Sequence, residues 1–182
     1  MSDPITLAEM PIAAAWNVQG NASRADFTDQ VARQFSIALP LAPNTTARSD
    51  ALTAFWLGPR SWLLVAEAAN SPLAGFIEKR DALNAAGSAL FDLSAARVAY
   101  RLAGARATEL LATGCPLDLH PRAFRAGDCA QSVFGRVNAL LCKSDEAPTF
   151  IIMVARSFAR DVRRSLNFSA CKHDYGANAT QL

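Results

Sequence analysis

Few side chains in this sequence of 182 residues could act as a nucleophile or a base. It contains two histidines, His120 and His173, and four cysteines. Cys115 lies five residues before His120, in a loop bounded by prolines, so a Cys–His pair for nucleophilic catalysis is conceivable. No neighbouring residue supplies the third group that would orient the imidazole. A structural or interface role for this loop is therefore the favoured interpretation.

The remaining polar residues do not form a known catalytic pattern. The cysteines have no C-x-x-C spacing, which favours buried thiols over a metal site, and they are Cys115, Cys129, Cys142 and Cys171. Asp118 and Asp128 are not spaced to share a helix face, so paired-carboxylate chemistry has no support. Glycine-rich phosphate-binding motifs are also absent from the sequence.

Three arginines lie along one predicted strand and the residues that follow it. Arg97, Arg101 and Arg106 could line an anion pocket. Arginines in such positions more often pair with nearby acidic residues or with the carboxylates of a partner protein, and this interpretation is favoured.

The composition favours a protein with a covered apolar surface. Hydrophobic residues make up 51% of the chain and charged residues 19%, with a net charge of +2. This charge is too small to indicate binding to nucleic acid or to an anionic membrane. Neither a signal peptide nor a membrane-spanning apolar run is recognisable, so a cytoplasmic protein is expected.

The elements that must position these residues are organised around Ala89 to Leu111. The sequence predicts a strand over 89–93, a polar corner at Asp92 and Ser94, and a second strand in which Val98, Tyr100 and Leu102 share one face. Gly104 ends this strand, and Leu110 and Leu111 mark a short helix that packs on the sheet.

Two halves of the chain have the same order of parts. In the first half, a strand over 13–19 precedes a helix capped by Ser23, a proline loop, a hairpin over 52–57 and 62–65, and a helix that starts at Ser71–Pro72. In the second half, the strand and helix after residue 97 precede a proline loop, strands over 130–137, 139–142 and 149–154, and a helix capped by Ser157.

This repetition predicts an α+β fold made of two pseudo-repeated β-α-β-β-α halves packed together as one compact unit. The halves are expected at 5–87 and 88–168. The tail, 169–182, has no periodicity and is expected to fray or to follow a partner.

The segment LFDLS, Leu90 to Ser94, with the alternating strand, LAG and Ala-rich helix after it, resembles a motif of the folate-dependent aminomethyltransferases, including the T-protein of glycine cleavage. Ala95 and Ala96 stand where those enzymes usually have a histidine and a methionine. The resemblance implies a fold like the aminomethyltransferase folate-binding domain.

Over residues 5–168 the chain is more specifically similar to the gamma subunits of heterotetrameric sarcosine oxidase. The segments that carry this resemblance are LPLAPNT, FWLGPRSWLLV, GCPLDLHPRAF followed by CAQS, and APTFIIMVARSFARDVRRSL. It implies an accessory, non-catalytic subunit of an enzyme that oxidatively demethylates sarcosine to glycine, forms hydrogen peroxide and transfers the one-carbon unit to tetrahydrofolate.

The same resemblance implies the partners and the location of the cofactors. The beta subunit would hold FAD and covalent FMN, the alpha subunit NAD and the tetrahydrofolate site, and the delta subunit zinc, so this chain itself would bind no cofactor or metal. The alpha subunit, part of which shares the aminomethyltransferase fold, is the expected direct contact.

The proline loop between Pro116 and Phe124 is the first candidate for that contact, because prolines reduce the freedom lost on docking. The aromatic residues that flank the first hairpin turn are either core residues or a second candidate for contact. The candidate contact residues are Leu117, Leu119, His120, Pro121, Phe124, Trp56 and Trp62. Two alternatives remain open, namely a stand-alone folate-binding or aminomethyltransferase-like protein and a homodimeric interaction module.

Overall fold

The computed structural model describes residues 4–67 and 75–179, with side chains described as far as residue 170. The chain forms two compact units. One comprises Pro11–Arg97, and the other comprises Met1–Met10 together with Val98–Leu182. The helix start predicted at Ser71–Pro72 lies outside the described residues.

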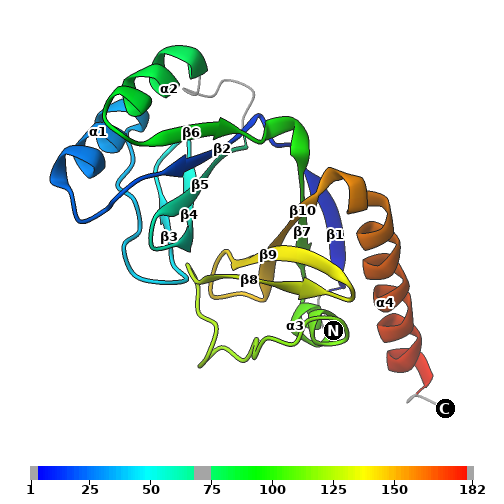
Figure 1. Ribbon diagram of the computed structural model, residues 1–182. Coiled ribbons are helices and arrows are strands. Elements are labelled where there is room, and N and C mark those ends of the chain that lie inside the picture. The colour runs from blue at the N-terminus through cyan, green and yellow to red at the C-terminus, as the bar shows by residue number, and fades with distance from the viewer. Residues whose placement is uncertain (1–3, 68–74, 180–182) are drawn as a thin grey trace. The chain divides into compact units, whose positions relative to one another are not determined.

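The unit formed by Pro11–Arg97 is a five-stranded sheet with the strand order β3-β4-β5-β2-β6. Helices α1 and α2 lie on one face of this sheet (Figure 1). As the helical spacing predicts, Phe27, Val31 and Phe35 of α1 are buried. Its elements are β2 (Ala14–Gln19), α1 (Ala25–Phe35), β3 (Thr46–Arg48), β4 (Thr53–Gly58), β5 (Ser61–Ala66), α2 (Phe76–Ala85), β6 (Ala89–Asp92) and the 3-10 turn η1 (Ser94–Ala96).

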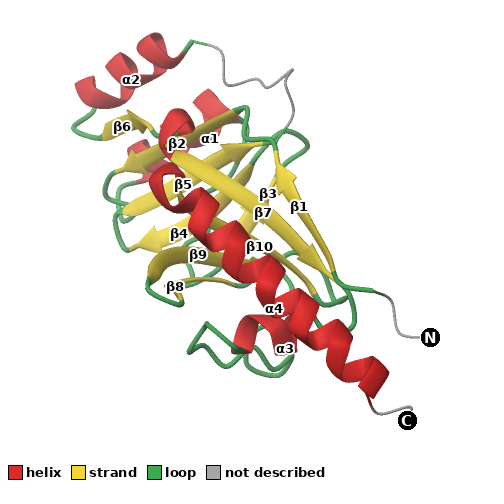
Figure 2. Cartoon of the chain, turned by 90° about the vertical axis from the view of Figure 1, so that its right-hand side faces the viewer, coloured by secondary structure: helices red, strands yellow, loops and turns green. Residues whose placement is uncertain are grey.

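The second unit is also a five-stranded sheet, with the order β1-β7-β10-β9-β8. Figure 2 shows α4 running across the face of this sheet, with α3 beside it. Val98, Tyr100 and Leu102 of β7 share the buried core with both helices, as the alternation predicts. Its elements are β1 (Thr6–Met10), β7 (Arg97–Ala103), α3 (Ala107–Ala112), β8 (Cys129–Phe134), β9 (Val137–Lys143), β10 (Thr149–Ala155), the 3-10 turn η2 (Arg156–Phe158) and α4 (Ala159–Ala179).

The two units have the same architecture, but they exchange their first strands. In chain order, β1 through α2 matches β6 through α4 element by element, apart from the short 3-10 turns. Yet β1 pairs antiparallel with β7, and β6 pairs antiparallel with β2. Each sheet therefore has, at one of its edges, the first strand of the other sequence repeat.

This exchange explains how the units differ from the predicted halves. The sequence divides into repeats near residue 87, whereas the units divide after Met10 and after Arg97. The β-α-β-β-α pattern also omits β1 and β3, which are short strands at the sheet edges. Periodicity over three to five residues is too short to predict such strands reliably.

A glycine allows β1 to approach the end of β7. Gly104 has a φ of +125°, and a Cβ placed on it would lie 2.6 Å from the carbonyl oxygen of Pro4. A side chain at residue 104 would therefore clash with backbone that cannot move without displacing β1.

Several local predictions are wrong. Ser23 is not the cap of α1, because Arg24 holds the N-cap position and the Asp26 carboxylate accepts the Phe27 N–H. The strand predicted over 130–137 ends at Phe134, where Gly135 and Arg136 form a turn before β9.

The end of the chain also differs from its prediction. The turn η2 precedes α4, so Ser157 lies inside a 3-10 turn rather than at the cap. Val162 and Leu166 are buried as predicted, but Phe158 is 47% exposed. Within 169–182, where no regular structure was expected, α4 continues to Ala179.

The strand exchange yields a direct prediction. Removing residues 1–10 should leave β7 without its antiparallel neighbour, because β1 supplies the partners of residues 99–103. Hydrogen–deuterium exchange should then accelerate at backbone amides of β7 and remain unchanged at β2, although β2 is nearer in sequence to the deletion. Faster exchange confined to β2 would contradict the observed pairing.

Candidate interaction surface

The polar corner after β6 joins that strand to β2. Ser94 donates its hydroxyl to the Asp92 carboxylate, which also accepts the Ser94 N–H at 2.9 Å. The Ser94 hydroxyl oxygen accepts the Ala15 N–H at 3.0 Å, and the Leu93 N–H donates to the Ala15 carbonyl at 2.7 Å. Asp92 and Ser94 are therefore engaged in holding the sheet together.

The loop over residues 113–128, between α3 and β8, is anchored by apolar side chains. Leu119 is 3% exposed, Phe124 is 6% exposed, and both belong to the core cluster beneath α3 and α4. Leu117 is half-buried against the same cluster. The loop is thus fixed to the sheet unit at several points along its length.

Hydrogen bonds set the shape of this loop. Asp118 accepts the His120 N–H at 3.0 Å, and Nδ1 of His120 accepts the Arg122 N–H at 3.2 Å. Asp128 accepts the Arg125 N–H at 2.6 Å. Because Nδ1 acts as an acceptor, the neutral imidazole of His120 carries its proton on Nε2.

The loop presents a basic surface beside its buried anchors. His120, Arg122 and Arg125 are exposed, as is Pro121. No carboxylate pairs with Arg122 or Arg125 in the part of the chain that the structure describes. The contact residues predicted from the sequence do not include these two arginines. Their positions on either side of the anchoring Phe124 are the sequence feature that would have indicated them.

Three of the predicted contact residues are core residues instead. Leu119 and Phe124 anchor the loop, and Trp62 is 1% exposed with its indole N–H donating to the Pro40 carbonyl at 2.8 Å. Their side chains are unavailable to another chain, because the protein's own core already surrounds them. Trp56 is half-buried against the core of its unit.

The conceivable Cys–His pair does not form. Cys115 is buried and its thiol interacts with the Ser132 hydroxyl at 3.8 Å, whereas His120 is exposed and binds the Arg122 amide. Asp118 and Asp128 fix separate turns. The loop therefore has a structural network rather than a nucleophile and its base.

The three arginines of the predicted anion pocket have separate environments. Arg106 forms an ion pair with Glu109 at 3.0 Å, which agrees with the local-pairing interpretation. Arg101 is exposed on β7, and Arg97 falls in the other compact unit.

A buried tyrosine connects β7 to the start of α4. Tyr100 is 2% exposed, and its hydroxyl donates to the Ala159 carbonyl at 2.8 Å. Burial raises the pKa of Tyr100 above 10.0, Glu9 raises it further, and Arg163 lowers it. The phenol therefore remains protonated in the folded protein at a pH where an exposed tyrosine begins to ionise.

A polar cavity of about 430 Å³ lies at one end of the other sheet. Its lining includes Gln19, Asn21, Arg24, Arg60 and Ser88. Arg24 forms an ion pair with Asp26, and this hydrogen bond lowers the pKa of the Asp26 carboxyl. The cavity has the polarity to hold a small anion or water, but it contains no acid–base pair.

The described residues provide neither a metal-binding cluster nor a membrane-spanning helix. Residues 4–67 and 75–179 contain no cluster of three or more histidine, cysteine or acidic side chains arranged to hold a metal ion. Over the same residues, none of the helices combines the length and the apolar character needed to span a bilayer.

The fold is similar to that of an aminomethyltransferase. The chain aligns over 90% of its length with 45% of the glycine cleavage system aminomethyltransferase T from Bartonella henselae, with a TM-score of 0.62 and 17% identity. This similarity establishes the aminomethyltransferase-like fold expected from the sequence, and at this level of identity it supports no conclusion on activity.

A closer similarity identifies the family. The family model for the sarcosine oxidase gamma subunit matches residues 19–170, so the chain belongs to the sarcosine oxidase gamma subunit family. It also aligns over 92% of its length with 84% of a chain in the heterotetrameric sarcosine oxidase from Corynebacterium sp. U-96 in complex with pyrrole 2-carboxylate, at a TM-score of 0.83 and 25% identity.

Two curated relatives agree with this assignment. The chain is 33% identical over 104 residues to sarcosine oxidase subunit gamma of Arthrobacter sp. and 31% identical over 123 residues to that of Corynebacterium sp. (strain P-1). These alignments cover 57% and 67% of this chain, and they span 50% and 59% of the respective relatives.

The division of the loop into anchors and surface can be tested by a matched pair of substitutions. Leu119→Ala should destabilise the protein by about 2–5 kcal/mol, because it leaves a cavity in the core. His120→Ala, one residue further on, should cost about 1 kcal/mol or less, because the imidazole is exposed. Urea unfolding measures both, and equal costs would contradict the described loop.

The raised pKa of Tyr100 gives a pH dependence of stability. The folded state holds the phenol proton more tightly than the unfolded state, so this contribution is present below pH 10.0 and is lost as the pH rises above it. Tyr100→Phe should reduce this alkaline loss while costing about 1 kcal/mol near neutral pH through the missing hydrogen bond. Unfolding midpoints of both proteins from neutral to alkaline pH measure the difference, and parallel pH curves would refute it.

Proposed function

We propose that this chain is an accessory, non-catalytic subunit of a cytoplasmic heterotetrameric sarcosine oxidase. In this proposal the assembly demethylates sarcosine oxidatively to glycine, releases hydrogen peroxide and passes the one-carbon unit to tetrahydrofolate. FAD, FMN, NAD, zinc and tetrahydrofolate would be bound by the other subunits. The observation that carries the proposal is the match of 92% of this chain to a chain of a heterotetrameric sarcosine oxidase, with a TM-score of 0.83.

The anchored loop supports a role in assembly. Its shape is fixed by the burial of Leu119 and Phe124 in the core and by the hydrogen bonds that Asp118 and Asp128 accept from the loop backbone. A loop that is already ordered loses little conformational entropy on docking, which favours binding. We propose that the alpha subunit is the direct partner and that Leu117, His120 and Pro121 belong to the contact.

The charge on this loop indicates the character of the partner surface. Arg122 and Arg125 project from an ordered backbone and are exposed. Guanidinium groups held in this way favour carboxylates on the opposing chain, which would fix the orientation of docking. Trp56, which is half-buried in the other unit, is proposed as a separate contact.

The proposal is tested by capture of the complex. The chain, carrying an affinity tag, is co-expressed with the candidate alpha, beta and delta subunits, and the captured material is assayed for peroxide formation with sarcosine. Recovery of the other subunits together with sarcosine-dependent peroxide formation supports the proposal. Recovery of this chain alone, under conditions that preserve oxidase activity in the unbound fraction, would overturn it.

Charge reversal of the loop should weaken capture. Arg122→Glu combined with Arg125→Glu should reduce affinity for the other subunits about tenfold or more, which corresponds to about 1.4 kcal/mol per factor of ten. Arg33→Glu, an exposed reversal on α1, is the matched control and should leave capture unchanged. Equal recovery with the loop variant and the wild-type chain would exclude the loop from the interface.

The enzymatic alternative has its own measurement. A chain that acts as a stand-alone folate-binding protein should bind tetrahydrofolate by itself, with a dissociation constant below roughly 10 μM. Isothermal titration of the isolated chain with tetrahydrofolate distinguishes this alternative from the accessory subunit, for which no heat of binding is expected.

A further inference from the structure

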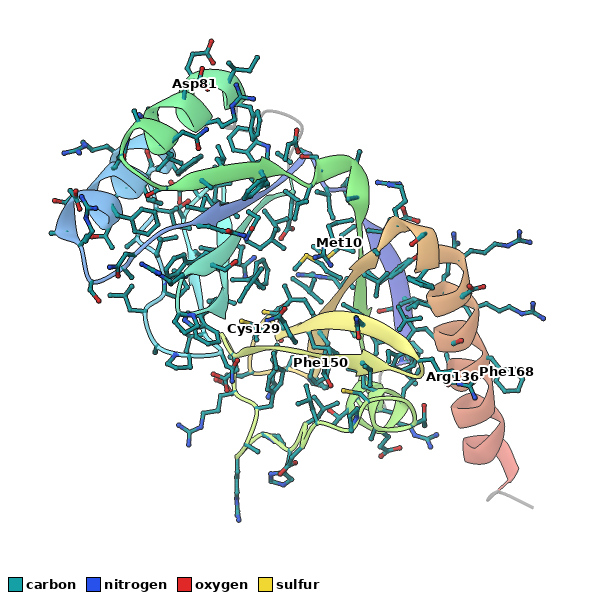
Figure 3. All side chains as sticks on the ribbon, in the orientation of Figure 1. Met10, Asp81, Cys129, Arg136, Phe150 and Phe168 are labelled. Atoms are coloured by element: carbon teal, nitrogen blue, oxygen red, sulfur yellow. The ribbon has the colours of Figure 1, made fainter. Side chains whose placement is uncertain are left out.

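Two cysteines lie directly opposite each other on neighbouring strands. Cys129 is the first residue of β8, and its partner in the antiparallel register is Cys142 of β9. Both residues carry thiols and both are buried, at 0% and 4% exposure. Figure 3 shows Cys129 at one end of the β8–β9 hairpin and Arg136, in the turn, at the other.

The hydrogen-bond pattern places this pair at a non-hydrogen-bonded site. The hairpin turn consists of Gly135 and Arg136, and a two-residue turn is closed by a hydrogen-bonded pair, here Phe134 and Val137. Along this side of the hairpin, the residues that belong to hydrogen-bonded pairs then recur at every second position, namely 132, 130 and 128. The Lys143 N–H donates to the Asp128 carbonyl at 3.0 Å, as this alternation requires.

At such sites opposing side chains are closest. The Cα atoms of a non-hydrogen-bonded pair are about 4.5 Å apart. A disulfide needs Cα atoms about 4.4–6.8 Å apart, so the register satisfies the backbone requirement for a bond between Cys129 and Cys142. Cys115, which interacts with Ser132 on the alternate face of β8, does not share this position.

We propose that Cys129 and Cys142 form a latent dithiol that hydrogen peroxide converts into a cross-strand disulfide at the base of the contact loop. The proposal rests on the proposed function only for the source of the peroxide, which the oxidase reaction would supply. One thiol loses its proton, and the thiolate attacks a peroxide oxygen and breaks the O–O bond. The hydroxide that leaves takes up this proton, so one sulfenic acid and one water form. The second thiol then displaces a second water from the sulfenic sulfur, so two thiols are oxidised and one peroxide is reduced to two waters.

The burial of both thiols governs the rate of this reaction. Peroxide must reach a side chain that is 0–4% exposed, so the first step depends on local opening of the sheet. β8 is the edge strand, and opening it separates only the β8–β9 pair. The second step is fast by comparison, because the register places the two cysteines opposite each other once β8 and β9 are paired.

The position of the bond would connect oxidation to the loop. Cys129 directly follows the loop over residues 113–128, whose other end is anchored at Cys115 and Leu119. A disulfide would prevent separation of β8 from β9 where the loop enters the sheet. Peroxide would in this way fix the proposed contact loop in its docked shape.

Peptide mapping tests the proposal on the full chain. The chain is treated with reagent hydrogen peroxide under native conditions, the peroxide is removed with catalase, and the thiols are alkylated in denaturant. Tryptic cleavage places Cys129 in the peptide over 126–136 and Cys142 in the peptide over 137–143. The expected product is these two peptides joined, with the loss of two hydrogen atoms and of alkylation at both cysteines, while Cys115 stays alkylated.

The controls identify the pair and the oxidant. Cys142→Ala should abolish the linked peptides, whereas Cys115→Ala, another buried cysteine in the same unit, should leave them unchanged. Full alkylation of Cys129 and Cys142 after peroxide treatment of the wild-type chain, or linkage through Cys115, would overturn the proposal. Because this result uses reagent peroxide, it holds or fails independently of the capture experiment.

A second arm examines the source of the peroxide. In the captured complex, sarcosine turnover should produce the linked peptides, and added catalase should prevent them. Linkage that persists in the presence of catalase would overturn peroxide as the oxidant.

Discussion

The reciprocal exchange of β1 and β6 is the constraint on which the rest of the structure depends. Strand β1, the first strand of the first repeat, pairs with β7 of the second repeat. Strand β6, the first strand of the second repeat, pairs with β2 of the first repeat. A half of the chain taken alone would lack an edge strand and would leave β2 or β7 with unpaired backbone groups. The sequence repeats are therefore not the structural units, because each sheet is complete only when a strand of the other repeat is present.

Much of this fold could be predicted from the sequence, because its repeated elements have clear periodicity. The apolar spacing of Phe27, Val31 and Phe35 and the alternation of Val98, Tyr100 and Leu102 both correspond to buried faces. The exchange could not be predicted, because the side-chain pattern of a strand shows which face is buried but not which strand lies beside it. Similarly, α4 extends beyond its periodic part, because an established helix adds a hydrogen bond with each further residue.

The order of the proline loop could be predicted from the sequence, but which of its side chains are exposed could not. The two prolines indicated an ordered loop, but loops lack a periodicity that would separate inward from outward residues. Large apolar side chains such as Leu119, Phe124 and Trp62 suit a contact surface and a core equally well from the sequence, and the structure places all three in the core. The exposed surface consists of their neighbours, among them His120 and Arg122, whose direction is set by the turn at Asp118.

The use of polar side chains in this chain favours a supporting role. Asp92 and Ser94 join β6 to β2, Asp118 and Asp128 shape the loop, and Tyr100 holds the start of α4. A carboxylate or hydroxyl that satisfies backbone groups in this way is not available to move a proton on a substrate, and moving it would leave those groups unsatisfied. The hydrogen bonds of Asp118 and Asp128 also order the loop, which would lower the entropy cost of the docking proposed above. The fold of an aminomethyltransferase can thus persist in a chain whose polar residues maintain a surface.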